Sequence, residues 1–462
     1  MAATDAVAER LAGSVPDAVL SVLDELHAGG HAAYVVGGSL RDALLGREPD
    51  DWDLATDARP ERIVSLFRGA VYENRFGTVA VRRDGWIFEV TTFRFEHDYA
   101  DFRRPHRVEF GDDLEADLAR RDFTVNAIAW GRNGDGDANG LADPFDGVAD
   151  LRRRLLRAVG DPAARFREDA LRMVRAVRLA AVLGFEIEAA TLAAIREHAP
   201  LVAHLSGERL GAELEKLLAA PEPSIGLRLM ADTGLLDVIA PELAAQRGVP
   251  QNKVAGEDLW DHTLRTVDAV PPTGPVVRLA ALMHDIGKPS TLVDGHFHHH
   301  DTVGAQLAED LLRRLRFPRP VIDDVAHLVR QHMFTLDPEL GDAGARRFLR
   351  RIEPRYLDEL FELRRADDIG SGRPGDDPRL RAFRARLEAE IAADAALDRT
   401  ALAIDGDDLM RELALAPGPR LGRLLDALVE RVVDDPALND PATLLLLART
   451  LADDDEGREA TP

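Results

Sequence analysis

The stretch VVGGSLRDALLGREPDDWDLAT, from Val35 to Thr56, holds two carboxylates, Asp51 and Asp53, one residue apart. Alternate residues of a strand point to the same face of a sheet, so these carboxylates are expected to converge. Converging carboxylates suit Mg²⁺, which prefers oxygen ligands and retains its bonds to phosphate. Glu89, in FEVTTFR on a predicted hairpin strand, is the candidate for a third carboxylate in a two-metal phosphoryl-transfer site.

Two glycines precede these acids, between a predicted buried strand and a predicted helix. Gly37 and Gly38 would let backbone N–H groups approach a triphosphate at the helix N-terminus, which favours negative charge. Ser39 could cap that helix, and Arg41, near its first turn, could clamp a phosphate. Either feature alone would be an ordinary turn or an exposed edge strand. The order strand, glycines, helix and strand favours the phosphate-binding interpretation.

A second candidate site lies beyond the middle of the chain. His284 and Asp285 follow one another late in an apolar helix, LAALMHDIGKPST. An imidazole beside a carboxylate can ligate one divalent metal. Lys288 follows within the same segment and could meet a phosphate. The segment therefore predicts a second metal site.

The elements that must hold these residues change character along the chain. Over roughly the first 155 residues, short strand patterns alternate with helices, and GTVAVRRDGWIFEVTTF predicts a hairpin that turns at Asp84 and Gly85. The basic segment from Phe102 to Gly111 shows no strong periodicity and is predicted to be a loop. From Asp161 onward helical patterns take over. We expect an α+β head, with a small mixed sheet and helices, followed by an all-helical remainder.

The bulk composition limits the classes of protein. A chain of 462 residues is expected to form roughly two to four domains. It has no cysteine, which excludes disulfides and thiolate zinc sites. The beginning, MAATDAVAERLAG, does not resemble a signal peptide, and the longest apolar run, at Leu444, is far shorter than the ~20 residues of a membrane span. We therefore expect a cytoplasmic protein without membrane association.

Charge is distributed unevenly. The net charge of −24 and the pI of about 5.0 would by themselves argue against a nucleic-acid partner. Between Leu151 and Leu179, however, nine arginines are opposed by only three acids, Asp161, Glu168 and Asp169. Such a basic stripe on an acidic protein is compatible with contact to nucleotide or RNA phosphates. Nearly all basic residues are arginine, which we attribute to genome composition.

Four motifs give the first half of the chain a family resemblance. They are GGSLRDALLG…DDWDLAT, RRDFTVNAIAW (Arg120–Trp130), DPFDGVADL (Asp143–Leu151) and EDALRMVRAVR (Glu168–Arg178). In this order, within Ala32 to Lys216, they resemble the class II tRNA nucleotidyltransferases, which are the CCA-adding enzymes, and their relatives the bacterial poly(A) polymerases. The resemblance implies a Mg²⁺-dependent nucleotidyltransferase head.

The second motif implies contacts to the sugar and the triphosphate. In the family it reads the ribose, which suggests that Arg121 and Asp122 bind ribose and phosphates with Asn126 beside them. A structural Arg–Asp pair is the alternative. With Arg120 and the residues above, the nucleotide-binding set expected in the head is Gly37, Gly38, Ser39, Arg41, Arg120, Arg121, Asp122 and Asn126.

The fourth motif implies contacts to the base. Asp169, Arg172, Arg175 and Arg178 recur every three residues, and we expect them on one helix. The resemblance implies that Asp169 and Arg172 pair with the base edge. A carboxylate would accept from the exocyclic amine of C or A, and a guanidinium would donate to a ring nitrogen or oxygen. Arg175 and Arg178 would meet phosphates or tRNA. The charged face of an ordinary amphipathic helix is the alternative.

The second candidate site resembles an HD phosphohydrolase domain. The family's metal ligands match His262, His284, Asp285 and Asp367, and its second-metal or phosphate-binding positions match His300 and His332. The resemblance implies a divalent metal, whose identity the sequence does not give, and hydrolysis of a phosphomonoester or a cyclic phosphodiester by a metal-bound water. An HD fold retained only for packing is the alternative.

The expected activity is addition of C, C and A to a tRNA 3′ end from CTP and ATP without a nucleic-acid template. The Gly-Thr-Val of NRFGTVAV and the acidic C-terminus favour this over a bacterial poly(A) polymerase. Two further alternatives are an HD phosphohydrolase with a nucleotide-binding head and a non-catalytic RNA-binding module. The expected domains are a nucleotidyltransferase head (1–158), a helical neck with the base template and RNA binding (159–245), an HD domain (246–375) and a C-terminal helical region with a disordered acidic tail (376–462). The sequence leaves the oligomeric state open.

Overall fold

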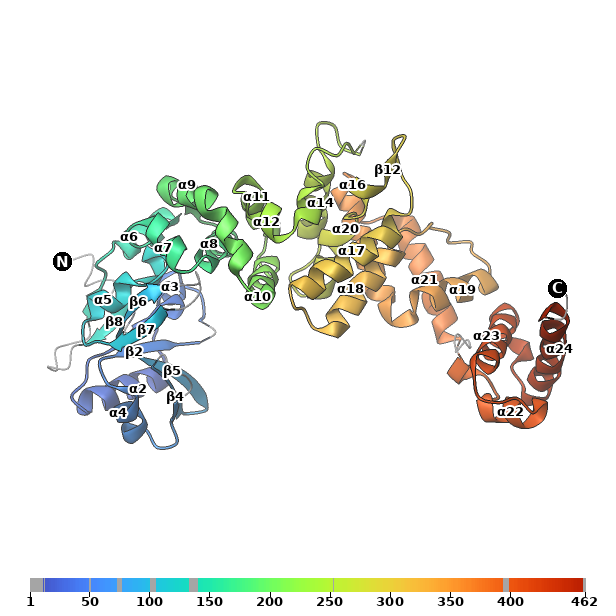
Figure 1. Ribbon diagram of the computed structural model, residues 1–462, viewed down its shortest axis with the longest axis horizontal. Coiled ribbons are helices and arrows are strands. Elements are labelled where there is room, and N and C mark those ends of the chain that lie inside the picture. Colours follow the sequence, from blue (N-terminus) through green and yellow to red (C-terminus); the bar gives the residue numbers. More distant parts are fainter. Residues whose placement is uncertain are drawn as a thin grey trace. The chain divides into compact units, whose positions relative to one another are not determined.

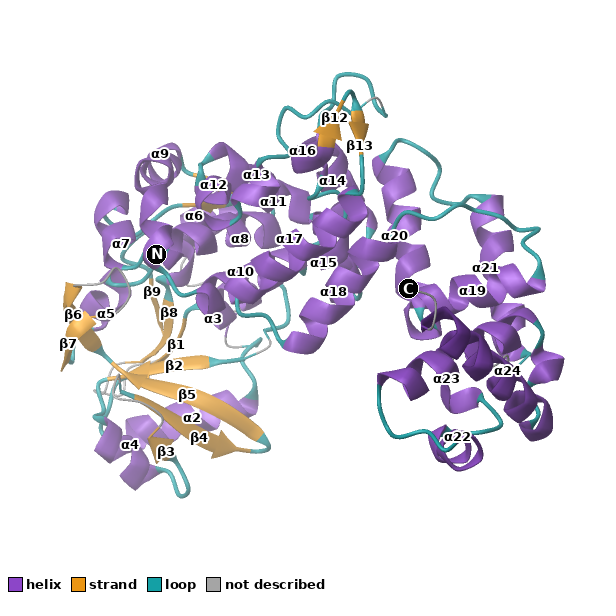
Figure 2. Cartoon of the chain, turned by 45° about the vertical axis from the view of Figure 1, so that its right-hand side comes forward, coloured by secondary structure: helices purple, strands orange, loops and turns teal. Residues whose placement is uncertain are grey.

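The computed structural model describes residues 11, 13–49, 51–72, 77–99, 105–132, 140–251, 253–393 and 399–459. The chain forms two compact units. The first contains Met1–Ala244 together with Arg314–Phe317, and the second contains Ala245–Arg313 and Pro318–Pro462. Figures 1 and 2 show the strands of the head in the first unit and the helices that follow.

The first unit is built on a mixed sheet, as predicted. Its described strands form a seven-stranded sheet in the order β3-β4-β5-β2-β1-β8-β9, in which only β2 and β5 pair in parallel (Figure 2). The strands are β1 (Ala33–Val36), β2 (Asp53–Thr56), β3 (Val71–Tyr72), β4 (Thr78–Arg83), β5 (Trp86–Thr92), β8 (Ala129–Arg132) and β9 (Gly140–Ala142).

Helices cover this sheet because its central strands are apolar on both faces. All four residues of β1 are buried, and Tyr34 and Val36 pack in a cluster with Phe93, Leu118 and Val159. Such burial on two faces requires a layer on each side. The head helices are α2 (Asp17–Ala28), α3 (Gly38–Leu44), α4 (Pro60–Leu66), α5 (Leu114–Ala119) and α6 (Gly147–Arg153), with the short 3₁₀ helix η1 (Thr124–Asn126).

One predicted loop is a hairpin. Strands β6 (Arg94–Tyr99) and β7 (Pro105–Phe110) pair antiparallel, so the loop prediction for Phe102–Gly111 is wrong for residues 105–110. Residues 101–104 lie outside the described ranges. The two strands are rich in charged residues and lack apolar alternation, which is the signal on which strand prediction depends.

Helices dominate after Asp161, as predicted. In the first unit they are α7 (Pro162–Glu168), α8 (Leu171–Leu183), α9 (Ala189–His198), η2 (Ala199–His204), α10 (Gly207–Leu218), α11 (Pro223–Asp232), α12 (Leu235–Ile239) and α13 (Pro241–Ala244). A two-residue parallel pair, β10 (Leu155–Leu156) with β11 (Glu186–Ile187), interrupts them.

The second unit is also helical, apart from the small hairpin β12 (Leu292–Val293) and β13 (His296–Phe297). These elements confirm the predicted fold class. The described helices are α14 (Leu259–Ala269), α15 (Pro275–Met283), α16 (Lys288–Thr291), α17 (His300–Arg314), α18 (Arg319–Gln331), α19 (Asp342–Ile352), η3 (Pro354–Tyr356), α20 (Leu357–Gly370), α21 (Pro378–Ala392), η4 (Arg399–Ala401), α22 (Gly406–Leu413), α23 (Pro419–Asp434), η5 (Pro436–Leu438) and α24 (Pro441–Glu459).

The prediction of a disordered acidic tail is wrong up to Glu459. Helix α24 continues through this segment to Glu459, and residues 460–462 lie outside the described ranges. Leu444 and Ala448 of the same helix are fully buried in the C-terminal core. Each residue that continues an existing helix adds one hydrogen bond without a new nucleation cost, so the helix extends into the acidic segment. Within the described ranges, no helix combines the length and apolar character that crossing a membrane requires.

Candidate active site

The first unit contains a pocket of about 720 Å³. It lies between the end of β1, the start of β2, α8 and α10. Eight cationic and five acidic side chains line it, so it suits a polyanion that carries a metal. The lining residues are Gly37, Gly38, Arg41, Asp42, Asp51, Asp53, Arg120, Arg121, Asp122, Asn126, Asp169, Leu171, Arg172, Arg175, Arg178, Leu179, Val182, Arg209, Lys216 and Ala219.

All head residues of the sequence-based site prediction line this pocket except two, Ser39 and Glu89. Ser39 is buried beneath the glycines, where its hydroxyl donates to Val36 O at 3.2 Å and accepts from Asp53 N at 3.4 Å. Glu89 is exposed on β5 and lies directly beside Asp53 in the parallel register of β2 and β5. The register of β2 and β5 therefore brings Glu89 beside Asp53, and Asp51 precedes Asp53 by two residues.

The carboxylate pair has the electrostatics of a cation site. The pKa of Asp53 is raised to about 6, first by burial and then by the nearby charges of Asp51 and Glu89, while Arg121 opposes the shift. Asp53 begins β2, and Asp51 precedes it with Trp52 buried between them. Carboxylate oxygens that repel one another at a pocket fit a hard divalent cation such as Mg²⁺.

Gly37 occupies a position that excludes a side chain. Its φ of +79° is in the left-handed region, and a Cβ there would lie 3.0 Å from Arg121 Nη1 and 3.3 Å from Asp53 Oδ2. Helix α3 begins at the next residue, Gly38. Glycine at position 37 thus leaves the backbone close to the carboxylate and the guanidinium.

A hydrogen-bond network joins the first, second and fourth motifs. Arg175 donates to Asp122 Oδ2 from Nε at 2.8 Å and from Nη2 at 2.6 Å. Asn126 donates to Asp122 Oδ1 at 2.9 Å and accepts at its own Oδ1 from Arg41 Nη1 at 2.7 Å. Arg41 also binds Asp42 through two nitrogens, at 2.7 and 3.0 Å. These contacts hold the cationic side chains in fixed positions around the pocket.

Asp169 lies outside the helix that was predicted to carry it. Helix α8 begins at Leu171, and Asp169 has extended backbone angles of φ −143° and ψ 105°. Of the four residues that were predicted to share a helix, only Arg172, Arg175 and Arg178 are helical. Arg172 is buried, and donates to Glu168 Oε2 at 2.7 Å and to Arg120 O at 2.8 Å.

Several charged residues that line the pocket or pair with its lining residues escaped the sequence prediction. Arg209 of α10 donates to Asp169 Oδ2 at 2.8 Å, and Glu213 of the same helix accepts from Arg178 Nε at 2.6 Å. Lys216 also lines the pocket and is exposed. Arg209, Glu213 and Lys216 are separated by four and three residues, which places them on one face of α10. This spacing is the sequence signal that could have identified them. Asp117 was missed too, although it pairs with Arg120 at 2.8 Å and with Arg121 at 3.5 Å.

In the second unit, all six predicted ligands of the second site come together. His262 Nε2 lies 3.1 Å from His284 Nε2 and 3.2 Å from Asp367 Oδ1. His300 and His332 form a second group with Asp285. The ligands come from α14, the ends of α15 and α18, the start of α17, and α20.

Asp285 connects the two groups through its two oxygens. Oδ2 lies 3.1 Å from His284 Nε2 and 3.5 Å from His262 Nε2. Oδ1 lies 3.5 Å from His300 Nε2 and 3.7 Å from His332 Nε2. A carboxylate in this position could bridge two divalent ions.

The histidines present the correct nitrogen for a metal. The Nδ1 atoms of His284, His300 and His332 lie 2.8, 3.0 and 2.6 Å from the carbonyls of Ala281, Phe297 and Val329. A carbonyl only accepts, so these Nδ1 atoms carry the proton and each Nε2 offers a lone pair to the site. Burial lowers the pKa of His284 and of His300, which favours the neutral ligand form. Within the described ranges, Nε2 of His300 and Nε2 of His332 are buried without a hydrogen-bond partner, as expected for atoms that ligate a metal.

Two lysines contact these ligands. Lys288 donates to Asp285 Oδ2 at 2.7 Å, in agreement with its predicted place at the site. Lys253, which the sequence prediction missed, lies with Nζ 3.3 Å from Asp367 Oδ1 and 3.3 Å from His262 Nε2. Each ammonium group neutralises part of the charge of the carboxylate that it contacts.

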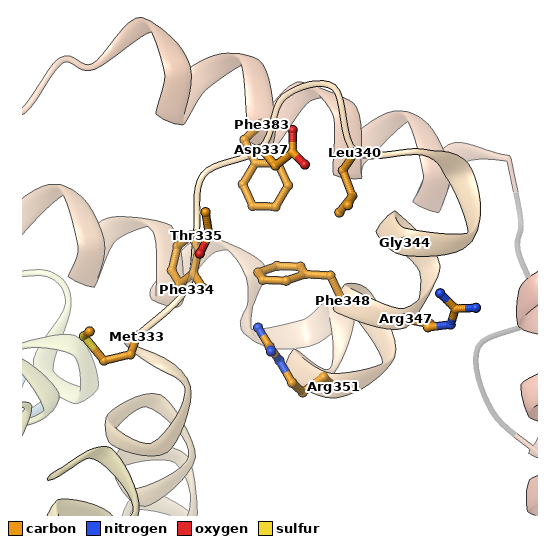
Figure 3. Close-up of a pocket in the computed structure, with 10 residues that line it drawn as sticks. All are labelled: Met333, Phe334, Thr335, Asp337, Leu340, Gly344, Arg347, Phe348, Arg351 and Phe383. Carbon is orange, nitrogen blue, oxygen red and sulfur yellow. The ribbon is translucent and has the colours of Figure 1, made fainter. Parts of the chain in front are cut away.

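A further hollow in the second unit, of about 640 Å³, lacks such chemistry. Figure 3 shows the rings of Phe334, Phe348 and Phe383 along it, with Arg351 beside Phe348. Its charged lining residues are Asp337, Arg347 and Arg351, and they do not form a group of metal ligands. This hollow therefore offers no metal site among its lining residues.

Comparison with known proteins matches three parts of the chain to family models. Residues 33–157 match the poly A polymerase head domain, residues 184–247 the probable RNA and SrmB-binding site of polymerase A, and residues 261–394 the HD domain. The chain is 34% identical over 429 residues to the CCA-adding enzyme of Geobacillus stearothermophilus, covering 91% of this chain and 93% of that protein. It is 34% identical over 434 residues to the CCA-adding enzyme of Lactiplantibacillus plantarum, covering 94% and 95%.

Solved structures give the same relationship. The crystal structure of the Bacillus stearothermophilus CCA-adding enzyme in complex with CTP aligns with a TM-score of 0.70 and 30% identity, over 96% of this chain and 98% of that one. The Thermotoga maritima CCA-adding enzyme complexed with tRNA aligns with a TM-score of 0.57 over 96% and 98%; at 18% identity it supports the fold alone. Fold and head pocket together define a nucleotidyltransferase of the poly A polymerase type. The chain belongs to the family of CCA-adding enzymes.

Proposed function

We propose that this enzyme adds C, C and A to the 3′ end of tRNA, using CTP and ATP and no nucleic-acid template. The observation that carries the proposal is the pocket of the first unit, where two carboxylates, a glycine pair and a cationic wall meet. Membership of the CCA-adding family supports the same substrates. We assign the reaction to the cytoplasm, where tRNA is available.

We assign metal binding in the head to Asp51 and Asp53, with Glu89 as the adjacent third carboxylate. Mg²⁺ bound there would lower the pKa of the attacking 3′-hydroxyl and neutralise charge on the triphosphate. The chain's own residues position the reactants. The N–H groups at Gly37 and Gly38 and the start of α3 accommodate the phosphates, and Ser39 supports the turn beneath them.

The cationic side chains would hold the sugar and phosphates of the nucleotide. Arg41, Arg120 and Arg121 are assigned to the triphosphate, and Asp122 with Asn126 to the ribose hydroxyls. Asp122 is already bound to Arg175, which keeps its carboxylate oriented toward the pocket. Such preorganised partners lower the barrier because they need not reorient during the reaction.

Asp169 and Arg172 are assigned to base recognition. The Asp169 carboxylate accepts from the exocyclic amine of C or A, and Arg172 donates to the neighbouring ring atom. Arg175 and Arg178 contribute positive potential toward phosphates or tRNA. We further propose the domain division 1–158, 159–245, 246–375 and 376–462 as head, neck, HD domain and C-terminal helical region.

The test is nucleotide incorporation on a tRNA that lacks its 3′ CCA, with each labelled NTP alone and in combination. Addition of C, C and then A, followed by arrest, is the expected result, and Asp51→Ala should abolish it. A long A tail from ATP alone would point to a poly(A) polymerase. Absence of incorporation with all four nucleotides would overturn the proposal.

The histidine site supports a second candidate function. We propose that His262, His284, Asp285, Asp367, His300 and His332 bind divalent metal and hydrolyse a phosphomonoester or a cyclic phosphodiester. The bridging position of Asp285 and the two buried Nε2 atoms without partners support this. The test is release of inorganic phosphate from an RNA 3′-terminal phosphate, or opening of a 2′,3′-cyclic phosphate to a phosphomonoester. Asp285→Asn should abolish either reaction while nucleotide addition persists.

A further inference from the structure

Helix α10 contributes to the head pocket through a residue that the four motifs do not contain. Arg209 lines the pocket, and its Nη2 donates to Asp169 Oδ2 at 2.8 Å. The side chains are only 25% and 19% exposed, so water screens the pair weakly. Arg209 thus contacts the carboxylate to which base recognition is assigned.

The local position of Arg209 is unfavourable for an arginine. It lies in the first turn of α10, which begins at Gly207, and the N-terminus of a helix carries partial positive charge. Within the described ranges, its Nη1 is buried without a hydrogen-bond partner. A buried donor without a partner is costly unless a bound group satisfies it. Positions that break local rules in this way are often functional.

Asp169 is held at both of its oxygens. Oδ1 accepts from Leu171 N at 3.1 Å, and Oδ2 accepts from Arg209. The residue lies between α7 and α8 and has extended backbone angles. Arg209 therefore supplies one of the two contacts that orient the carboxylate within the pocket, and the only one of the two that comes from another helix.

The chemistry of this contact bears on which bases fit. An ionised carboxylate is an acceptor only, and each of its oxygens can accept a second hydrogen bond. Asp169, paired with Arg209, can accept from the exocyclic amine of C or A. It cannot donate to the carbonyl that U or G presents at the corresponding position. A protonated or rotated carboxyl group would lose that distinction.

We propose that Arg209 is a positioning residue for base selection, which fixes the orientation of the Asp169 carboxylate. The inference rests on the proposed function, and specifically on the assignment of Asp169 to the base edge. Its consequence is that discrimination between CTP or ATP and UTP or GTP depends on a helix outside the recognised motifs.

The experiment measures single-nucleotide addition by Arg209→Gln and Arg209→Lys in the full-length enzyme. The acceptor is a tRNA that lacks CCA for CTP and UTP, and one that ends in CC for ATP and GTP. The quantities are kcat and KM for each nucleotide. Arg196→Gln is the matched control, because Arg196 is an exposed arginine of α9 outside the pocket whose Nε donates only to Asp232 O. Thermal melting of each variant reports on folding.

We expect Arg209→Gln to reduce the CTP-to-UTP ratio of kcat/KM by about tenfold, mainly through KM, since a charge-assisted hydrogen bond is lost. Arg209→Lys, which keeps one donor and the charge, should recover part of that loss. A ratio within twofold of wild type for Arg209→Gln would overturn the inference, as would equal ratios for the two variants at equal Tm. Failure of the wild type to add any nucleotide would instead refute the proposed function.

Discussion

Arg175 donates two hydrogen bonds to a single oxygen of Asp122, at 2.6 and 2.8 Å, and thereby joins the fourth motif to the second. Asp122 is nearly buried, with 10% of its side chain exposed. Burial alone would raise the pKa of Asp122, but Arg175, Asn126 and Arg172 hold it well below its usual value. The pair therefore contributes to folding as well as to the pocket.

Removing one partner of this pair should destabilise the first unit. We expect Arg175→Met to cost about 3 kcal/mol, because the buried Asp122 carboxylate loses its ion pair and both hydrogen bonds from Arg175. The double variant Asp122→Asn/Arg175→Met should cost less than the sum of the single variants. Urea unfolding measures both, with Arg196→Met as the control. Because the folded-state pKa of Asp122 is depressed, its contribution is present above about pH 4 and is lost as the pH falls further. Strict additivity of the two substitutions would contradict the coupling.

Mg²⁺ should compete with a proton at Asp53. The pKa of Asp53 is raised to about 6, by burial first and by Asp51 second. Without metal, the protonated carboxyl group therefore stabilises the folded state. This contribution to the free energy of unfolding is lost as the pH rises through about 6. We expect metal-free Asp53→Asn to be more stable than wild type at pH 7, by about 1–3 kcal/mol. The difference should shrink at pH 5 and on addition of Mg²⁺ to the wild type. A difference that does not change with pH would show that Asp53 is not the titrating group.

The histidine site should hold two divalent ions. Asp285 faces His262 and His284 with one oxygen, and His300 and His332 with the other. We expect about two ions per chain in wild type, one in His332→Gln and none in Asp285→Asn, by elemental analysis after dialysis. Nucleotide addition in excess Mg²⁺ should remain unchanged in both variants. Equal metal content in all three proteins would contradict the bridging geometry.

Gly37→Ala separates backbone strain from the effect on the pocket. Both Gly37 and Gly46 have positive φ, +79° and +72°, but only the Cβ at position 37 would meet Arg121 and Asp53. Each substitution should cost about 1 kcal/mol of stability through the left-handed backbone. Gly37→Ala should in addition abolish most nucleotide addition, while Gly46→Ala retains it. Similar activities in the two variants would show that nucleotide addition does not require the close approach of the Gly37 backbone to Arg121 and Asp53.

Much of the candidate site was predictable because its chemistry lies in short, ordered motifs. The spacing of Asp51 and Asp53 predicted convergence, and the parallel register of β2 and β5 brings Glu89 beside Asp53. The six ligands of the histidine site also meet as expected. At both sites, the residue types and the predicted local elements were sufficient to predict which side chains come together.

Other features depend on tertiary packing that no local pattern encodes. Arg209 enters the pocket only because α10 packs against α8, and Lys253 reaches the histidine site from the segment before α14. Asp169 was assigned to a helix by its three-residue spacing, yet α8 begins two residues later. The charged strands of the β6–β7 hairpin lack the apolar alternation that a sequence-based prediction needs.

The distribution of lysine along the chain has a practical consequence. The chain contains three lysines, Lys216, Lys253 and Lys288, and all of them contact or line one of the two candidate sites. Lys216 is exposed and Lys288 is only 7% exposed. Amine-reactive dyes, biotinylation reagents and cross-linkers would therefore find few targets on the remaining surface. Coupling through lysine would block the sites instead of tethering the protein at a neutral position, and the exposed Lys216 and Lys253 would react more readily than the buried Lys288.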